Sequence, residues 1–335
     1  MPLLGDLDYL AARLHGRRGR MACGPRLRDL CGLGTPAALA EALFPASGII
    51  SASGIQARLA EDLVKEIRGI SRSLSGAQAA FIGWQGARFQ LENLKVMVRA
   101  LDAGRDRGEA ARLLTSLPAD IGYGPELAAA KDRAGLLAAL PAGIFRASLA
   151  KAYAARTGEG ALFFYEAALD RDYLAELAAR AAALAGEDRD YACRLCAQEA
   201  ALFNLALASR GRFSYSLDRK PLLEHFAPGA RFSRRRFGKM LDAAGPGELT
   251  ALAGAAVEPG RPEPAASGAE ALAWRRYAQL ALRAFRGSHI GFGAAAAYLA
   301  LRRVEVSDLT TISEGLRLKL EAGEILRRLS GVSYV

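Results

Sequence analysis

Hydrophobic residues along the chain recur at helical spacing in long stretches, and segments rich in glycine and proline separate these stretches. Leu91, Leu94, Val98 and Leu101 fall on one face of a helix, and Gly104 follows them as a stop signal. The same spacing joins Leu162 to Leu177. It predicts helices over 7–21, 37–43, 55–73, 91–101, 162–177, 191–209, 235–243, 274–285 and 294–320, with a surface loop or linker at 258–267.

A short pattern returns three times at nearly equal intervals. Each occurrence begins with an acidic or amide residue. The residue three positions later is polar in two of the three occurrences, and the residue directly after that is apolar. The three occurrences are Gln90 with Asn93, Glu199 with Leu202, and Glu305 with Asp308. In the second occurrence Asn204, just beyond Leu202, is the alternative counterpart of Asn93. The interval exceeds the roughly 20 to 50 residues of solenoid repeats, so we predict three repeated helical domains over 1–112, 113–216 and 217–335.

Composition narrows the fold class to all-α. Hydrophobic residues make up 51% of the 335-residue chain, and alanine and leucine dominate them, which favours helix over sheet. The longest apolar run, 287–301, is shorter than the roughly 20 residues that span a bilayer, and the N-terminus lacks the apolar core of a signal peptide. A cytoplasmic protein without a membrane span is expected. Its four cysteines are expected to be reduced.

The charge suggests an acidic partner. The formal net charge is +10, and arginines cluster at 17–20 and again at Arg231, Arg234, Arg235 and Arg236. Two phenylalanines, Phe232 and Phe237, interleave with the second cluster, and such rings can stack on nucleic-acid bases. The simpler interpretation of both clusters is a solvated helix end. No recognised nucleic-acid module accompanies them.

The usual motifs of catalysis and cofactor binding do not fit. Gly238-Lys239 lacks the leading glycine and the following serine or threonine of a phosphate-binding loop. The glycines at 291 and 293 follow a predicted helix, whereas a dinucleotide fingerprint follows a strand. The three histidines are far apart, and Cys193 and Cys196 lie within a helical pattern. We therefore expect no cofactor, no metal and no catalytic residues.

Motifs in three parts of the chain together resemble one family, the C-type subunits of the vacuolar/archaeal-type (V/A-type) rotary ATPases, which are the counterparts of the eukaryotic d-type subunits. Similar segments lie at 8–18, at 88–101 with Asn93-Leu94 at its centre, and at the Pro228-Gly229 turn. The C-terminal segments 297–309 and 324–329 match the family's closing helices most specifically. Leu202 and the Cys193/Cys196 pair, both in the second repeat, depart from the family pattern.

The resemblance implies a funnel or socket of three helical domains that is not an enzyme. Such a protein is a central-stalk connector that caps the cytoplasmic face of the membrane proteolipid ring and receives the shaft subunits, coupling rotation to proton or sodium transport. It lies peripherally on the cytoplasmic face of the membrane and binds no nucleic acid. The alternative from another class is a basic helical nucleic-acid-binding protein.

The candidate interface residues are the three repeated motifs and the second arginine cluster. We expect Gln90 and Asn93, Glu199 and Asn204, and Glu305 and Asp308 to occupy equivalent places, either near the shaft or as braces between helices within each domain. The second cluster, at 231–236, is expected to contact an acidic neighbour at the rim.

Overall fold

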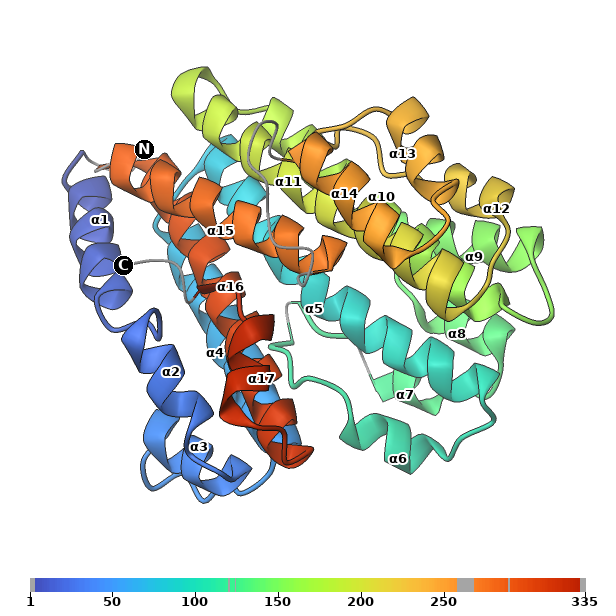
Figure 1. Cartoon of the computed structure of the whole chain (residues 1–335), viewed down its shortest axis with the longest axis horizontal. Helices are drawn as coiled ribbons and strands as arrows, with labels where there is room; N and C mark the ends of the chain where they lie inside the picture. Colours follow the sequence, from blue (N-terminus) through green and yellow to red (C-terminus); the bar gives the residue numbers. More distant parts are fainter. Residues whose placement is uncertain (1–3, 120, 124, 258–267, 289, 332–335) are drawn as a thin grey trace.

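The computed structural model describes residues 4–119, 121–123, 125–257, 268–288 and 290–331, and these residues form an all-helical protein (Figure 1). Within them there are seventeen α-helices, one π-helical turn and no strand. In order they are α1 (Leu4–Arg18), α2 (Pro25–Cys31), α3 (Pro36–Leu43), α4 (Ala52–Arg72), α5 (Gly76–Asp102), α6 (Arg107–Arg112), α7 (Pro125–Ala129), α8 (Arg133–Ala139), α9 (Ile144–Ala155), α10 (Ala161–Ala182), α11 (Gly186–Ser209), the π turn η1 (Arg210–Ser214), α12 (Arg219–Glu224), α13 (Arg234–Leu241), α14 (Pro246–Val257), α15 (Ala269–Gly287), α16 (Phe292–Arg317) and α17 (Ala322–Arg328).

The helices expected from hydrophobic spacing are present, and local signals set several of their ends. The side chains of Thr35, Ser51 and Ser233 accept hydrogen bonds from backbone N–H groups in the first turns of α3, α4 and α13. Gly104 follows α5 with a φ of 60°, the left-handed conformation in which glycine commonly ends a helix. The expected linker at 258–267 lies outside the described residues.

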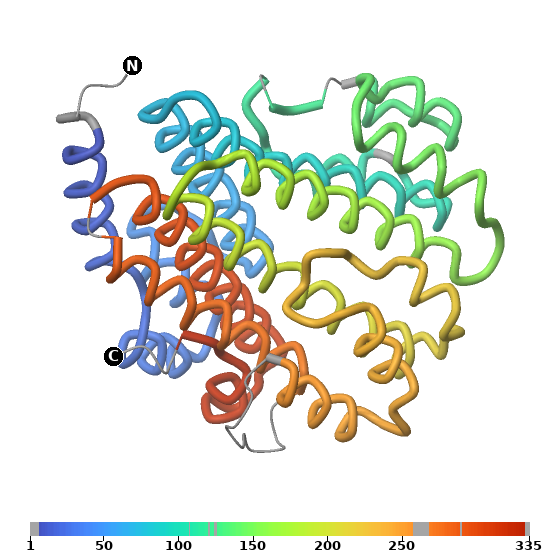
Figure 2. The backbone as a smooth tube through the Cα atoms, turned by 90° about the horizontal axis from the view of Figure 1, so that it is seen from above, coloured from blue at the N-terminus to red at the C-terminus, as the bar shows by residue number. Residues whose placement is uncertain are grey.

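Three pairs of long helices form the body of the molecule. The pairs are α4 with α5, α10 with α11, and α15 with α16, and the two helices of each pair pack together. Groups of shorter helices precede each pair along the chain, namely α1–α3, α6–α9 and α12–α14. In Figure 2 these groups lie at three different sides of the long helices.

The pairs also pack on one another in a closed order. Helix α5 packs on α10, α11 packs on α15, and α16 packs on α4, so each pair contacts the next and the third returns to the first. Most of the buried hydrophobic residues form one cluster that extends through all three pairs. A smaller cluster lies among α2, α3, α17 and the C-terminal half of α16.

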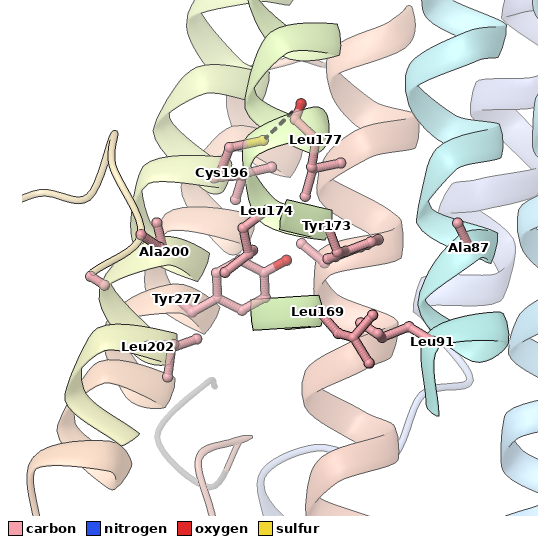
Figure 3. Packing of buried hydrophobic residues seen from close by; sticks show 14 of the residues in the cluster. Ala87, Leu91, Leu169, Tyr173, Leu174, Leu177, Cys196, Ala200, Leu202 and Tyr277 are labelled. Carbon is pink, nitrogen blue, oxygen red and sulfur yellow. Dashed lines mark hydrogen bonds between the residues drawn. The ribbon is translucent and has the colours of Figure 1, made fainter. Parts of the chain in front are cut away.

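The middle of the larger cluster is tightly packed and contains one of four free cysteines (Figure 3). Tyr277 of α15 lies there among residues of α10 and α11. The buried Cys196 directs its Sγ atom toward the backbone oxygen of Leu177, 4.0 Å away. Burial also raises the pKa of this thiol well above its usual value. Cys196 is therefore a packing residue, in agreement with the reduced thiols expected from the sequence.

Candidate functional site

Charged side chains from all three helix pairs line a cavity of about 290 Å³, here called the central cavity. Helix α5 contributes a stripe of four charges at intervals of three or four residues, which places them on one face of the helix. Helices α10, α11, α15 and α16 supply the rest. The lining contains five cations, Arg88, Lys95, Arg99, Arg210 and Arg303, and five carboxylates, Glu92, Glu166, Asp170, Glu199 and Glu270.

An ion pair between Glu199 of α11 and Arg303 of α16 lies at the inner wall of this cavity. The hydroxyl of Tyr277 donates a 2.7 Å hydrogen bond to the Oε1 atom of Glu199. Burial alone would raise the pKa of Glu199, but the adjacent Arg303 guanidinium holds it below its usual value. Glu199 is therefore a charged acceptor, and its Oε2 atom has no hydrogen-bond partner among the described residues.

A second ion pair connects the first helix pair to the second. The Nζ atom of Lys95 lies 2.7 Å from Asp170 of α10 and 3.2 Å from Glu92 of α5. Burial by itself would lower the pKa of Lys95, but these two carboxylates raise it above the usual value. Lys95 is thereby kept protonated. A lysine that acts as a base requires the opposite shift.

Equivalent polar contacts join each helix pair to the next. Arg99 of α5 makes a two-pronged contact with Glu166 of α10, at 2.5 and 2.8 Å. Arg210, which follows α11, contacts Glu270 of α15 in the same way at 3.2 and 2.8 Å. The third contact closes the order, because the amide of Gln56 on α4 lies 2.7 Å from Glu314 on α16.

Three of the residues predicted from the repeated motif make one repeated contact, here called a brace. Each brace joins a long helix to backbone 22 or 23 residues further along the chain. Asn93 exchanges two hydrogen bonds of 2.8 Å with the backbone of Thr115. Asn204 does the same with Ala227, at 2.8 and 3.0 Å. Asp308 accepts hydrogen bonds from the N–H groups of Ser330 and Gly331 at 2.8 and 2.6 Å.

The braces fix how the three motifs correspond. Asn204, and not Leu202, is the structural counterpart of Asn93 and Asp308. In this alignment Gln90 and Glu305 are equivalent, whereas Glu199 corresponds to Arg88 and Arg303. The grouping of Glu199 with Gln90 and Glu305 was therefore wrong by two residues, because glutamate and leucine at helical spacing occur in more than one register.

The remaining motif residues differ in their surroundings. Gln90 donates a hydrogen bond to the backbone oxygen of Ile121. Glu305 accepts a 2.5 Å hydrogen bond from the backbone N–H of Ala22 and pairs with Arg302. Of the six predicted motif residues, Glu199 lines the central cavity, and the other five hold neighbouring segments. Glu305 differs from the others, because its partner Ala22 lies 283 residues away, in the first of the three predicted domains.

The second arginine cluster lies at and just before the start of α13. Arg231, Arg234 and Arg235 are exposed, Arg236 is half-buried, and none of the four has an ion-pair partner among the described residues. Phe232 and Phe237 are buried, and both rings pack near Phe226, with ring centres 6.4 and 5.3 Å apart. The suggestion that these phenylalanines stack on bases was wrong, because they face the core.

A comparison with protein families identifies the chain. The profile of the ATP synthase (C/AC39) subunit matches residues 10–328, nearly the whole chain. The chain belongs to this family. It is thus related to the C-type and d-type subunits of the V/A-type ATP synthases, as its motifs suggested. No curated protein matches the chain. Among the described residues of this C/AC39 family member, no helix combines the length and apolar character that crossing a bilayer requires.

Several residues of the central cavity were not singled out from the sequence as interface candidates. A signal for them was present, because Arg88, Glu92, Lys95 and Arg99 form a charged stripe on a helix that is otherwise largely apolar. Asp170 and Glu270, by contrast, are ordinary charges on amphipathic helices. Only the packing of this C/AC39 family member shows that they face the cavity.

Proposed function

We propose that this protein is a non-catalytic central-stalk connector, which couples the rotating shaft of a V/A-type rotary ATPase to the membrane proteolipid ring for proton or sodium transport. Family membership supports the proposal that the protein is part of a V/A-type ATPase complex. The central cavity supports the proposal that it connects the shaft to the ring. The observation on which the proposal rests is the convergence of ten charged side chains from three helix pairs on one cavity.

The arrangement suits a part that transmits torque. A shaft tip bound by charges on several helices is held from several directions, whereas one apolar patch would resist rotation on one side only. The cavity carries as many carboxylates as cations, so it fits a tip that bears both charges. The partly exposed carboxylates of the lining, Glu166 and Glu270, are the acceptors that we propose for donors on the shaft.

The closed order of the helix pairs suits the same role. Force on one pair passes through α5 and α10, α11 and α15, or α16 and α4, to its neighbours. Exposed ion pairs each contribute only about 0 to 1 kcal/mol. The Arg99–Glu166 and Arg210–Glu270 pairs therefore orient the interfaces, while buried apolar packing supplies most of the stability. A funnel of three domains, over 1–112, 113–216 and 217–335, remains part of this proposal.

The arginine cluster at 231–236 is the proposed contact with an acidic neighbour at the rim. Arg234, Arg235 and Arg236 form the first turn of α13, where positive charge opposes the helix dipole. Three arginines at that position, without ion-pair partners in the described part of the chain, cost local stability, which favours a role in binding. A location on the cytoplasmic face of the membrane, peripheral to the proteolipid ring, accords with this contact.

Co-purification tests the proposal. The tagged protein is isolated from solubilised membranes of its own source, and shaft and proteolipid subunits are scored separately by mass spectrometry. We expect both to be recovered with the wild-type chain, and the shaft alone to be lost when the partly exposed Glu166 and Glu270 are changed to lysine. Recovery of neither partner with the wild-type chain would overturn the proposal.

A further inference from the structure

A second cavity, of about 340 Å³, lies between α9, α10 and the end of α12 and shares no lining residue with the central cavity. Helix α9 supplies Ser148 and Lys151 on one face, and Arg156 follows its last turn. Helix α10 supplies Arg171, and His225 follows α12. Polar groups from three separate elements therefore converge on one space.

Positive charge exceeds negative charge in this cavity. Three cations, Lys151, Arg156 and Arg171, line it together with a single carboxylate, Glu224. Arg156 is 3.3 Å from Glu224, and Arg171 pairs at 2.8 Å with Asp172, which lies outside the lining. Lys151 forms no ion pair with any described residue, so its charge is available to a ligand.

Two uncharged groups add hydrogen-bonding capacity. Ser148 is 4% exposed, and its Oγ atom has no hydrogen-bond partner within the described residues. An unmet hydroxyl at such a depth costs about 1 to 3 kcal/mol. The Nδ1 atom of His225 lies 2.9 Å from the backbone oxygen of Pro221. Because that oxygen only accepts, Nδ1 carries the hydrogen, and Nε2 is left for a ligand.

The surroundings of His225 disfavour its charged form. Burial lowers the pKa of His225, and the nearby Arg171 and Arg156 lower it further, against the opposing effect of the Pro221 hydrogen bond and of Glu224. A dianion among these groups would reverse the shift, because protonated His225 would then donate a hydrogen bond through Nε2.

We propose that this cavity binds a small phosphate monoester. Lys151 and Arg156 neutralise its charge, and His225, which takes up a proton when the dianion binds, donates a hydrogen bond from Nε2 to one of its oxygens. A dianion with several acceptor oxygens matches donors that approach from three elements, which a planar carboxylate satisfies less completely. The ester group occupies the remaining volume, beside the ring of Phe164, which already packs against Arg156 at 4.2 Å.

Histidine titration by NMR tests the site directly. The chain has three histidines, and the signal of His225 is assigned by its loss in His225→Asn. We expect glycerol 3-phosphate to raise the pKa of His225 by about 1 unit, as an opposite charge within a few ångströms does. Lys151→Gln should weaken this binding about tenfold or more. Lys65→Gln, which removes an exposed lysine on α4, should leave it unchanged.

A second experiment distinguishes a lipid headgroup from a soluble phosphate monoester as the ligand. Phosphatidylcholine vesicles with and without phosphatidic acid are tested for binding, with glycerol 3-phosphate as competitor. Binding that requires phosphatidic acid and is competed identifies a lipid headgroup, and a response to glycerol 3-phosphate alone identifies a soluble ligand. If neither moves the pKa of His225 more than potassium chloride of equal ionic strength, or if Lys151→Gln titrates as wild type, the site is refuted.

Discussion

Asn204 shows how a single side chain determines the course of the backbone in this protein. It is fully buried, and its amide both donates to and accepts from the backbone of Ala227. Asn93 makes the same two hydrogen bonds with the backbone of Thr115. Asp308 instead meets two N–H groups, from Ser330 and Gly331, and a carboxylate matches them because both of its oxygens accept.

Replacing the amide of Asn204 with a carboxylate should therefore destabilise the folded protein. In Asn204→Asp a carboxylate oxygen would face the carbonyl of Ala227, with the loss of a buried hydrogen bond. We expect a loss of about 3 kcal/mol in unfolding free energy at pH 7, measured by urea denaturation. Protonation at pH 5 restores a donor, so the deficit should narrow there. An equal deficit at both pH values, or one below about 1 kcal/mol, would contradict the brace.

Asp308 should give the stability of the protein a distinct pH dependence. Burial raises its pKa to about 6 from 3.8, although the backbone N–H groups of Ser330 and Gly331 oppose the shift. The folded state thus binds the proton more tightly than the unfolded state. The stabilisation from Asp308 is complete below about pH 4 and is lost as the pH rises through about 6.

Asp308→Asn removes this dependence, since an amide does not titrate. The unfolding free energy of wild type minus that of the variant should fall by up to about 3 kcal/mol between pH 4 and pH 7. Taking the difference cancels the titration of the other carboxylates. A difference that stays constant over this range would show that Asp308 is not perturbed.

Some of these buried hydrogen bonds could be predicted from the sequence. A polar residue inside an apolar helical stretch, as at Asn93 and Asp308, indicates a buried hydrogen bond. Its partner was not accessible, because Thr115, Ala227 and Ser330 lie in segments without periodicity. The charge on Glu199 was noticed, while its pairing with Arg303 was not, because the two residues lie on different helices that meet only in the fold.

At the scale of elements, close packing joins the end of α16 to α17, and the π turn after α11 to α12. A methyl group on Gly315 of α16 would lie 2.6 and 2.7 Å from side-chain atoms of Ile325 on α17. Gly211 occupies the equivalent place beside Leu222 of α12, and Ala100 does so on α5. Small residues at these positions bring the short helices close enough for the braces to form.

Gly315→Ala should consequently destabilise the protein by about 1 to 3 kcal/mol, because Ile325 is fully buried and cannot move aside freely. Gly69→Ala is the matched control. Gly69 lies within α4 with open space around its Cα, so alanine there should stabilise by about 0.5 to 1 kcal/mol. Thermal unfolding of both variants shows whether each substitution raises or lowers the stability of the protein. Stabilisation by both substitutions would disprove the close approach.

Periodicity identified the long helices and missed most of the short ones. Helices α10, α11 and α16 have continuous apolar faces, so their existence follows from spacing alone. Helices α2, α6, α7 and α12 have seven residues or fewer, which gives too few turns for a period to appear. The π turn after α11 also has no sequence signal.

At the scale of the whole molecule, the sequence indicated repetition but not closure. The all-α class and the six long helices follow from composition and spacing. The cyclic order depends on contacts such as Gln56 with Glu314, which lie 258 residues apart along the chain, and no local pattern encodes them. The central cavity arises from that order, which explains why most of its lining was not foreseen.

The rim contact makes a prediction at this scale. Changing Arg231, Arg234, Arg235 and Arg236 to glutamate should weaken assembly with the membrane complex, most strongly at low salt, because exposed charges are screened over roughly 8 Å at physiological ionic strength. The melting temperature should stay equal or rise, since acidic residues suit the first turn of α13. Pull-down over a salt series measures the effect.

A control reverses the exposed Arg105 and Arg112, which lie outside this cluster. Assembly should tolerate that change. If the cluster variant assembles normally at low salt, or if both variants fail alike, the arginines at 231–236 are a solvated helix end and not a binding site.

Photo-crosslinking in the intact complex tests the central claim, that the central cavity holds the shaft. Phe203 is half-buried in the cavity wall, and Tyr215 is exposed beyond α11 and does not line the cavity. With p-benzoylphenylalanine at 203, we predict a crosslink to a shaft protein that is absent when the same group replaces Tyr215. A complex that assembles and turns over ATP, but yields no shaft crosslink from position 203, would contradict the account.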